Sequence, residues 1–455
     1  MNKILIANRG EIAVRIIRTC KEMNIKTVAV YSEADKDALH TRLADEAICI
    51  GPADPGKSYL CVNNIIEAAS ITKCDSIHPG FGFLSENSQF AKICEESNIK
   101  FIGPNSKVID LLGNKSNAKK LMQKAGIPVI PGSNGTVDTI EDAIEISEKI
   151  GYPVMLKAAS GGGGKGIRVI NNIDELKKNY PIVRKEAKIS FKDDSIYIEK
   201  FIQNPRHIEF QILADEHGNV IHLGERDCTI QRKHQKIIEE TPSVAIDDKL
   251  RNKMGQVAVK VASISGYTSC GTVEFLLDVN KNFYFMEMNT RIQVEHPITE
   301  ERTGFDIVKE QIRIAAGEKI KFKQKDVVFK GHSIECRINA ENPSKNFMPC
   351  PGTIKDLNLP GGNGVRIDTA IYSGYKIPSN YDSMLAKIIC TGKNRNEAIS
   401  KMKRALEEVV VDGIDTNRDF LFEIIRTPNF IRGNFDTSFI EKEFFEKYKD
   451  IKDKK

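Results

Sequence analysis

The sequence has 455 residues, 40% of them hydrophobic and 28% charged, and its 67 basic and 62 acidic side chains leave a formal net charge of +5. This balance, with no basic run interleaved with aromatics, argues against nucleic-acid binding. The short N-terminal apolar run does not fit a signal peptide, and no apolar stretch reaches the ~18 residues of a membrane span. The ten cysteines contain no Cys-x-x-Cys pair, which is typical of a reduced compartment. We therefore expect a cytoplasmic protein of about three domains that does not bind membranes.

Residues 1–112 alternate short strand patterns with helical patterns, which predicts a doubly wound parallel sheet. The expected segments are Lys3–Ala7, Glu11–Met23, Lys26–Tyr31, Glu46–Ile50, Asn64–Thr72, Ser76–His78, Ser88–Ser97 and Phe101–Gly103. The first turn lacks Gly-x-Gly-x-x-Gly, so a dinucleotide-dependent oxidoreductase loses its main support. The loop from His78 to Asn87 is either part of a site or a strand-to-helix connection with Ser85 as the helix cap.

The Gly-rich segment Ser160–Gly166 is the second strong signal in the sequence. The elements expected before it are a helix (Lys115–Ala125), a hinge-like turn (Gly126–Gly132), a helix (Thr139–Lys149) and a strand (Tyr152–Ala159). The segment is not a P-loop, because Ile167 and Arg168 stand where Lys and Ser/Thr belong and a strand (Ile167–Ile170) comes next. A Gly-rich hairpin tip can offer bare N–H groups to phosphates, with Lys157 and Lys165 supplying charge. A plain flexible loop is the alternative.

Two polar segments follow a helix near Asp174–Ala187 and a strand at Ser195–Lys200. His207, Glu209 and Gln211 share one face of a strand over residues 205–213. In residues 225–236, Gln231, His234 and Lys236 are expected to face a common site. Both segments could instead be solvent-exposed surface.

Residues 271–297 form the most informative segment. After a helix at Asp247–Ser265, the apolar runs Thr272–Leu277 and Phe283–Met288 flank a turn-rich break and predict a β-hairpin. Register counting places Glu274 across from Glu287, with Asn289 on the same face. Opposed carboxylates repel unless a cation lies between them, and Mg²⁺ prefers such oxygen ligands. We expect the strand to continue through Arg291, Gln293 and Glu295, a row suited to holding a small anion beside a base. A solvated acidic hairpin is the alternative.

Beyond a helix at Asp306–Ala316, the chain from Val327 becomes β-rich. The expected elements are strands at His332–Asn339, Gly352–Leu357, Gly364–Asp368 and Met384–Thr391 and a helix at Glu397–Glu407.

Six separated motifs carry a family resemblance: NRGEIA, HPGFGFLSEN, the Gly-rich stretch from Tyr152 to Gly166, ERDCTIQRKHQK, FMEMNTRI and RIQVEHP. The chain resembles the biotin carboxylase component of acetyl-CoA carboxylase, an ATP-grasp ligase. The resemblance implies an α/β (α+β overall) ATP-grasp fold: a doubly wound domain (1–112), an ATP-grasp domain (113–330) with a mobile Gly-rich lid at about 131–203, a β-rich C-terminal domain (331–446) and a frayed tail (447–455).

The resemblance also implies the reaction. The family joins ATP and bicarbonate into carboxyphosphate with Mg²⁺ or Mn²⁺ and transfers the CO₂ unit to N1′ of biotin, which begins malonyl-CoA formation for fatty acid synthesis. The same subunit occurs in pyruvate and propionyl-CoA type carboxylases. The Ala-Met-Lys-Met biotin-attachment motif is absent, and the nearest match is Lys401-Met-Lys403. We therefore expect a separate biotin carboxyl carrier protein, carboxyltransferase subunits and a homodimer, with Arg15, Arg18 and Glu22 matching the interface region.

Site residues are implied position by position. ATP would contact Lys115, Lys157, Gly163, Gly164, Glu199, Lys200, Ile202, His207, Gln231 and His234, and the metal would bind Glu274, Glu287 and Asn289. Bicarbonate would bind Lys236, Arg291, Gln293 and Val294. The catalytic residues would be Glu295, as the base that takes the bicarbonate proton, with Lys236, Arg291 and Arg337, and biotin would meet Arg337, Tyr381 and Asp382.

Two other functions remain open. An ATP-grasp ligase that makes an acyl-phosphate of a different carboxylate is disfavoured by RIQVEHP and by the HQK segment. A nucleotide-sensing subunit without activity would be expected to lack Glu295, Lys236 or Arg337, and all three are present. We interpret Cys228 as structural, because the chemistry needs no thiol.

Overall fold

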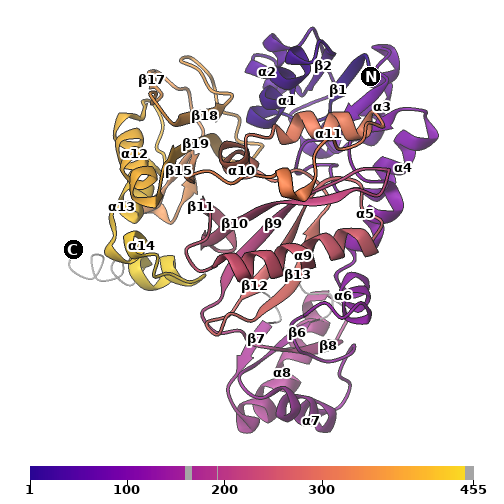
Figure 1. Cartoon of the computed structure of the whole chain (residues 1–455), viewed down its shortest axis with the longest axis vertical. Coiled ribbons are helices and arrows are strands. Elements are labelled where there is room, and N and C mark those ends of the chain that lie inside the picture. The colour runs from indigo at the N-terminus through magenta and orange to yellow at the C-terminus, as the bar shows by residue number, and fades with distance from the viewer. Residues whose placement is uncertain (159–166, 192, 446–455) are drawn as a thin grey trace. The chain divides into compact units, whose positions relative to one another are not determined.

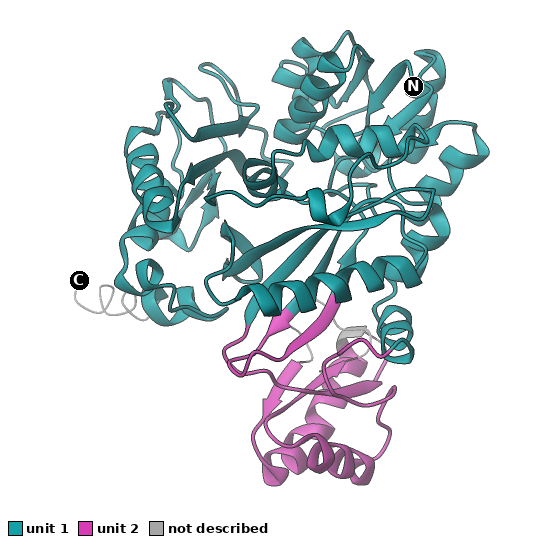
Figure 2. Cartoon of the chain, in the orientation of Figure 1, with its two compact units in different colours: residues 1–125, 206–275, 287–455 teal, residues 126–205, 276–286 magenta. Residues whose placement is uncertain are grey.

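The computed structural model describes residues 1–158, 167–191 and 193–445 (Figure 1). It divides into two compact units: unit 1 comprises residues 1–125, 206–275 and those from 287 onward, and unit 2 comprises residues 126–205 and 276–286 (Figure 2). The change of unit at Gly126 lies within the turn predicted as a hinge. The Gly161–Gly166 segment, including Gly163 and Gly164, and the tail 447–455 lie outside the described residues.

The N-terminal part of unit 1 contains a five-stranded parallel sheet with strand order β3-β2-β1-β4-β5. Leu5 of β1 pairs with Val28 of β2 and Ile77 of β4, and all three are fully buried, as expected for strands covered on both faces. The predicted doubly wound sheet is confirmed. Its elements are β1 (Lys3–Ile6), α1 (Gly10–Glu22), β2 (Lys26–Tyr31), α2 (Leu39–Leu43), β3 (Glu46–Cys49), α3 (Val62–Ile71), β4 (Ser76–His78), α4 (Ser88–Glu96), β5 (Lys100–Phe101) and α5 (Ser106–Gly113).

The loop before α4 differs from its prediction. The side chain of Asn87 accepts a hydrogen bond from the Phe90 amide and caps the helix, so the prediction of Ser85 as the cap is wrong. The Ser85 amide donates to Gly82 and the Asn87 amide to Leu84, so a turn separates Ser85 from the helix. Asn is among the most favourable residues at a cap.

Unit 2 is a small α/β layer. Its three-stranded antiparallel sheet, order β7-β6-β8, buries Val154, Leu156 and Ile198 beneath two helices. The elements are α7 (Ile140–Ile150), β6 (Val154–Ala158), β7 (Ile167–Ile170), α8 (Ile173–Phe191) and β8 (Ile196–Lys200). Helix α8 is longer than predicted and contains Pro181.

An eight-stranded sheet, order β13-β12-β9-β10-β11-β14-β19-β18, carries most of the polar residues singled out above. From β9 to β18 every neighbouring pair is antiparallel. The strands are β9 (Arg206–Ala214), β10 (Val220–Arg232), β11 (Gln235–Thr241), β12 (Ser269–Leu277), β13 (Phe283–Asn289), β14 (His332–Asn339), β18 (Val365–Thr369) and β19 (Met384–Gly392). Other helices of unit 1 are α6 (Lys115–Lys124), α9 (Asp248–Ile264), α10 (His296–Thr303) and α11 (Ile307–Ala315).

Strand β14 separates two environments. Ile334, Cys336 and Ile338 join the C-terminal hydrophobic core, whereas Glu335 and Arg337 occupy the opposite face because strand side chains alternate. The core is completed by α12 (Arg395–Glu408), α13 (Arg418–Arg426) and α14 (Pro428–Arg432). The short strands are β15 (Glu341–Asn342), β16 (Met348–Pro349), β17 (Leu357–Asn358) and β20 (Val410–Val411). The short helices are the 3₁₀ helices η1 (Glu33–Asp35), η2 (Pro55–Lys57), η3 (Gln324–Asp326) and η4 (Pro343–Lys345) and the π-helix η5 (Glu441–Phe445).

Two strand predictions are wrong. The predicted strand Gly352–Leu357 is mostly loop, because Thr353 forms only an isolated bridge to Lys376 before β17 begins. The strand predicted to continue to Glu295 ends at Asn289, and α10 begins at His296 with a proline in its first turn. Proline lacks an N–H and favours the first turn of a helix, so Glu295 enters the site from a helix cap.

The buried carboxylate of Glu240 gives a test of the sheet by pH. Its Oε2 lies 2.7 Å from His332 Nε2 and accepts a hydrogen bond from Arg395 Nε at 2.7 Å. Burial raises the pKa of Glu240, but the His332 hydrogen bond and the Arg395 charge outweigh burial and lower that pKa from 4.5 to about 2. The ionised side chain therefore stabilises the fold above its unfolded pKa, by about 3 kcal/mol, and this contribution is lost as the pH falls through about 2.

We expect Glu240→Gln to lower the urea midpoint of unfolding at pH 7. As the pH falls from 4.5 toward 2, the midpoint of the variant should approach that of the wild type. Circular dichroism can follow unfolding, since the chain contains no tryptophan. A difference between the two midpoints that does not change with pH would contradict the assigned ionisation.

Among the described residues, no helix combines the length and hydrophobicity needed to cross a membrane.

Candidate active site

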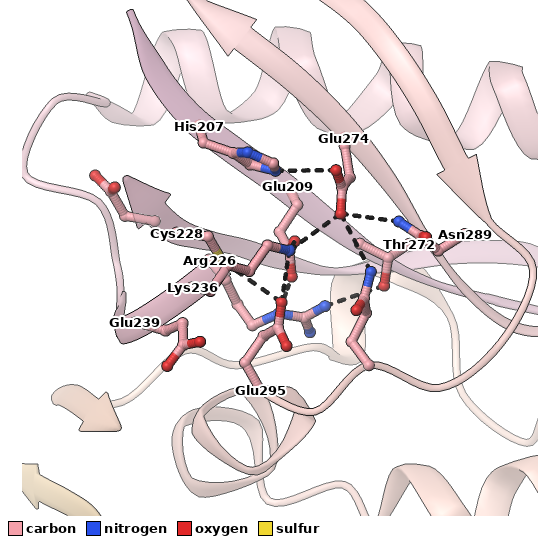
Figure 3. Close-up of polar contacts among 12 residues, drawn as sticks. His207, Glu209, Arg226, Cys228, Lys236, Glu239, Thr272, Glu274, Asn289 and Glu295 are labelled. Atoms are coloured by element: carbon pink, nitrogen blue, oxygen red, sulfur yellow. Dashed lines mark hydrogen bonds and ion pairs between the residues drawn. The ribbon is translucent and has the colours of Figure 1, made fainter. Parts of the chain in front are cut away.

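Lys236 of β11 lies among three buried carboxylates. Its Nζ is 2.5 Å from Glu209 Oε2, 3.0 Å from Glu274 Oε1 and 2.7 Å from Glu295 Oε1 (Figure 3). These carboxylates come from β9, from β12 and from the cap of α10. An unpaired buried charge is costly, and Lys236 offsets that cost for all three carboxylates. This one ammonium group therefore joins chain segments that are far apart in the sequence.

Arg226 of β10 supports the same cluster from a fully buried position. Its guanidinium donates to Glu209 at 2.5 Å, to Gln211 at 2.7 Å, to Thr272 at 3.0 Å and to Thr299 at 3.1 Å. The polar face predicted for residues 205–213 is therefore buried, and the solvent-exposed alternative is wrong for it. The charged segment 225–236 likewise forms β10 and β11 and is largely buried up to residue 230.

Glu295 is held from both sides by cations. Lys236 contacts its Oε1, and Arg337 Nη2 of β14 contacts its Oε2 at 2.8 Å. Arg337 also donates through Nε to Glu239 Oε1 at 2.7 Å. The structure thus brings together three of the four predicted catalytic side chains, Glu295, Lys236 and Arg337.

These contacts set the charges of the cluster. Burial raises the pKa of Glu295, but the charges of Lys236, Arg337 and Arg226 outweigh it and hold that pKa well below its usual value. Burial lowers the pKa of Lys236, but its acidic neighbours raise it well above the usual value. At neutral pH the site is therefore a compact set of ion pairs whose cations can be shared with incoming anions.

Of the predicted metal ligands, Glu274 belongs to this cluster, and Glu287 and Asn289 lie on β13. Asn289 Nδ2 donates to Glu274 Oε1 at 2.8 Å, and Glu287 Oε2 is 2.8 Å from the Nζ of Lys115, a side chain that is 79% exposed. Two carboxylates and an amide oxygen are the hard oxygen donors that Mg²⁺ or Mn²⁺ prefers. The donor set therefore fits such an ion, with Lys115 as the cation that would give way to it.

The loop after β13 carries the residues predicted for bicarbonate. Arg291 Nη1 donates to Gln293 Oε1 at 3.1 Å, and Gln293 Nε2 donates to Glu274 Oε1 at 3.2 Å. Arg291 Nε also donates to Glu86 Oε2 at 2.8 Å. Glu86 belongs to the HPGFGFLSEN motif, so this contact gives that motif a place at the site, which the sequence alone left open.

The predicted nucleotide contacts of unit 1 divide into two groups. His207 Nε2 is 3.0 Å from Glu274 Oε2, and His207 Nδ1 is 3.3 Å from Gln231 Nε2. His234 is exposed in the two-residue turn between β10 and β11, where it and Lys233 both have positive φ. The structure therefore brings His207 and Gln231 to the cluster and leaves His234 at the turn.

Unit 2 carries the other predicted nucleotide contacts. Lys157 Nζ of β6 is 2.6 Å from Glu199 Oε2 of β8. Lys200 Nζ donates to the carbonyl oxygens of Gly151 and Tyr152, and Ile202 is half-buried.

The biotin residues predicted besides Arg337 have other neighbours. The Tyr381 hydroxyl is 2.5 Å from Ser32 Oγ and donates to the Ala53 carbonyl at 2.8 Å, and the Arg9 guanidinium lies 4.3 Å from the Tyr381 ring centroid. Asp382 accepts a hydrogen bond from the Met384 amide. These contacts fix Tyr381 against the N-terminal part of unit 1.

Sequence reasoning missed several buried charges of the site. Lys387 of β19 is fully buried and donates from Nζ to the Val294 carbonyl at 2.9 Å, beside Glu11 at 3.1 Å. Arg226, Glu239 and Glu335 were not singled out either. A charged residue within an otherwise apolar strand is the signal that could have found Lys387.

Cys228 lies next to the catalytic candidates without an evident chemical role. Its Sγ is 3.7 Å from Glu295 Oε1. Burial, followed by the nearby Glu209 charge, raises the pKa of this thiol well above its usual value. A neutral, buried thiol is a poor nucleophile, which agrees with the structural interpretation.

Three family models together cover most of the chain. Residues 1–109 match the biotin carboxylase N-terminal domain, residues 114–323 match the ATP-binding domain of the carbamoyl-phosphate synthase L chain, and residues 335–442 match the biotin carboxylase C-terminal domain.

Two curated relatives match this chain over nearly their whole lengths. Biotin carboxylase 1 of Bacillus subtilis is 56% identical over 442 residues, which is 97% of this chain and 98% of the relative. The biotin carboxylase of Pseudomonas aeruginosa is 51% identical over 443 residues, which is 97% of this chain and 98% of the relative.

Solved structures of biotin carboxylases are similar to this chain. A biotin carboxylase–beta-gamma-ATP complex from Campylobacter jejuni superposes with a TM-score of 0.91 at 50% identity, and the match covers 97% of this chain and 99% of that chain. The biotin carboxylase domain dimer of 2-oxoglutarate carboxylase from Hydrogenobacter thermophilus, with MgADP, ADP and bicarbonate, has a TM-score of 0.89 at 49% identity and covers 97% of each chain.

Proposed function

Because the chain belongs to the biotin carboxylase family, we infer that it is a ligase that carboxylates biotin at the expense of ATP and bicarbonate. This inference is carried by the family likeness, which extends over 97% of the chain. It is supported by the ion pairs that join Lys236 and Arg337 to the buried Glu295. The predicted ATP-grasp fold and family are confirmed. The role of each residue below is our proposal.

Bicarbonate would bind where cations and amides surround a carboxylate. Lys236 and Arg291 would neutralise it, Gln293 and the backbone of Val294 would orient it, and Glu295 would lie beside its hydroxyl. Glu295 takes the proton of bicarbonate while a bicarbonate oxygen attacks the γ-phosphorus of ATP, which gives carboxyphosphate and ADP. Bicarbonate is a weak nucleophile until this proton leaves, which is why a fixed base is needed.

The ion pairs of the free protein suggest how this base becomes effective. Glu295 has a low pKa because Lys236 and Arg337 both contact it. An anion that shares Lys236, and a biotin that engages Arg337, would each weaken one of those contacts. The pKa of Glu295 would then rise toward the working pH, so substrate binding itself would make the carboxylate a better base.

The second step would occur at Arg337. Carboxyphosphate delivers its CO₂ unit to N1′ of biotin and releases phosphate. This phosphate takes the N1′ proton, and the ureido oxygen gains negative charge as that proton leaves. A guanidinium fixed beside that oxygen stabilises the charge as an oxyanion hole does. Tyr381 and Asp382 stay proposed as biotin neighbours from the family resemblance alone.

The nucleotide and metal ligands are proposed from the family resemblance. Glu274, Glu287 and Asn289 would hold Mg²⁺ or Mn²⁺, which when bound neutralises phosphate charge. The residues that would contact ATP are Lys115, Lys157, Gly163, Gly164, Glu199, Lys200, Ile202, His207, Gln231 and His234. Charge neutralisation and positioning account for most of phosphoryl-transfer catalysis.

We propose that biotin arrives on a separate carboxyl carrier protein and that the protein is a homodimer which works with carboxyltransferase subunits in the cytoplasm. Relatives of nearly the same length are named biotin carboxylases, and one similar structure is described as a domain dimer. The acyl acceptor is proposed to be acetyl-CoA, with a pyruvate or propionyl-CoA type carboxylase as the close variant.

Release of ADP tests the function directly. We expect bicarbonate plus free biotin to stimulate ADP release from ATP, and chelation of divalent metal to abolish the stimulation. Amino-acid substrates serve as the control. Stimulation by amino acids but not by bicarbonate would instead identify an acyl-phosphate ligase of the same superfamily.

A further inference from the structure

The face of the eight-stranded sheet that carries Arg337 also carries a row of buried charged side chains on adjacent strands. Glu239 of β11 pairs with Glu335 of β14, Arg337 of β14 pairs with Lys387 of β19, and Lys387 pairs with Asp368 of β18. Cross-strand partners lie on the same face with Cβ atoms about 4.5–5.5 Å apart. Two acidic side chains are therefore neighbours within the protein interior.

These two carboxyl groups lack enough donors. Arg337 contacts Glu239 Oε1 through Nε at 2.7 Å and Nη2 at 2.5 Å. Glu239 Oε2 and both carboxyl oxygens of Glu335 are buried and have no hydrogen-bond partner among the described residues. Like charges directly opposite each other destabilise a sheet, and a buried charge without a partner is costly.

The surrounding charged groups do not relieve this shortage. Lys387 contacts Glu11 and Asp368 at 3.1 and 3.8 Å, and Lys236 contacts the three carboxylates described above. From α10, Glu295 adds a negative charge, while His296 is buried with a pKa held well below its usual value by burial and then by the Lys387 charge. Cys228 stays a neutral thiol, as shown above.

We propose that Glu239 and Glu335 share one proton at neutral pH and, as a singly charged pair, position Arg337 beside Glu295. A proton on the pair supplies the missing donor and removes one of the two opposed charges. Glu239 and Glu335 are positioning residues, since both act through Arg337. Their effect on turnover rests on the proposed function, whereas the shared proton does not.

The electrostatics agree with this geometry. Burial raises the pKa of Glu335 well above its usual value, and Glu239 opposite adds to that effect against Lys387. Burial also raises the pKa of Glu239, to about 7, against the opposing charge of Arg337. Such a pair titrates as a unit. When the shared proton leaves at alkaline pH, a second negative charge draws Arg337 away from Glu295 and from the biotin position, and activity should fall.

Glu335→Gln tests the pair, because it places a neutral side chain of nearly the same shape where we infer a protonated acid. We expect kcat/KM for biotin to stay within about threefold of wild type at neutral pH, and the alkaline decline that belongs to the pair to disappear from the pH profile. Glu240→Gln is the matched control, since Glu240 follows Glu239 on β11 but contacts His332 and Arg395. It should keep the wild-type profile.

Infrared difference spectroscopy tests the shared proton without turnover. At pH 7 wild-type protein should show a carboxylic-acid C=O band that Glu335→Gln lacks. Should that variant fail to fold, Glu239→Gln should shift or remove the same band. Superimposable pH profiles for wild type and Glu335→Gln, or no change of the band in either variant, would overturn the proposal. Absence of bicarbonate-dependent ATP cleavage in wild type would overturn the proposed function instead.

Discussion

Replacing Glu295 with glutamine is expected to lower bicarbonate-dependent ATP cleavage by about 10²–10⁴-fold, the usual contribution of a general base. Gln keeps the size of the side chain and can still accept hydrogen bonds, but it cannot take the bicarbonate proton. The loss should appear in kcat with little change in the KM for ATP, since the proposed ATP ligands are untouched. Steady-state ADP release at saturating bicarbonate measures it.

The same substitution changes charges that the free protein balances. Lys236 and Arg337 each lose their contact with an ionised carboxylate, but Lys236 keeps Glu209 and Glu274, and Arg337 keeps Glu239. The fold should therefore survive, and circular dichroism should verify it.

Glu301→Gln is a matched control for Glu295→Gln. Glu301 belongs to α10, is partly exposed and makes one contact with Arg366, at 3.4 Å. We expect this control to retain wild-type turnover. Full activity of Glu295→Gln would disprove the assigned base, and an equal loss in both variants would indicate damage to α10.

Replacing Arg226 with alanine is expected to destabilise unit 1 by about 3–5 kcal/mol, the usual cost of removing one partner of a buried ion pair. Arg226 is fully buried and bonds side chains from β9, β12 and α10. Without it, Glu209 loses a charged partner and Gln211 and Thr272 lose donors. Glu209 would then keep only Lys236 as the cationic partner named above, and Lys236 also serves Glu274 and Glu295. The change is measured from the guanidinium midpoint of unfolding, followed by circular dichroism.

A double variant separates charge from packing. Glu209→Gln together with Arg226→Met removes both members of the pair, so it should recover part of the stability lost in Arg226→Ala. Arg404→Met is the control, because Arg404 pairs with Glu408 on the exposed side of α12, where such pairs contribute about 0.3–0.5 kcal/mol. An Arg226 variant as stable as the Arg404 control would contradict the supporting role that we assign to Arg226.

The secondary structure was predictable wherever local signals were strong. The alternation of the first 100 residues and the hairpin around Asp278 follow from short apolar runs separated by turn residues. Prediction failed where a local pattern had two interpretations. The spacing of Arg291, Gln293 and Glu295 fits a strand, but the proline after His296 favours the start of a helix. These residues lie between the strand and the helix, and periodicity does not give the positions of side chains in such a connection.

Residue types and their order were sufficient to identify the family and to nominate Glu274, Glu295, Lys236 and Arg337, because each step of the chemistry needs a particular group. Tertiary structure alone decided the partners of these groups. Arg226 lies within the ERDCTIQRKHQK motif, and Glu239, Glu335 and Lys387 lie outside the motifs, but nothing in the sequence shows which groups they contact. Their effect depends on distance and burial, since the strength of a charge–charge interaction is set by separation and by exclusion of water, and only the packed sheet fixes both.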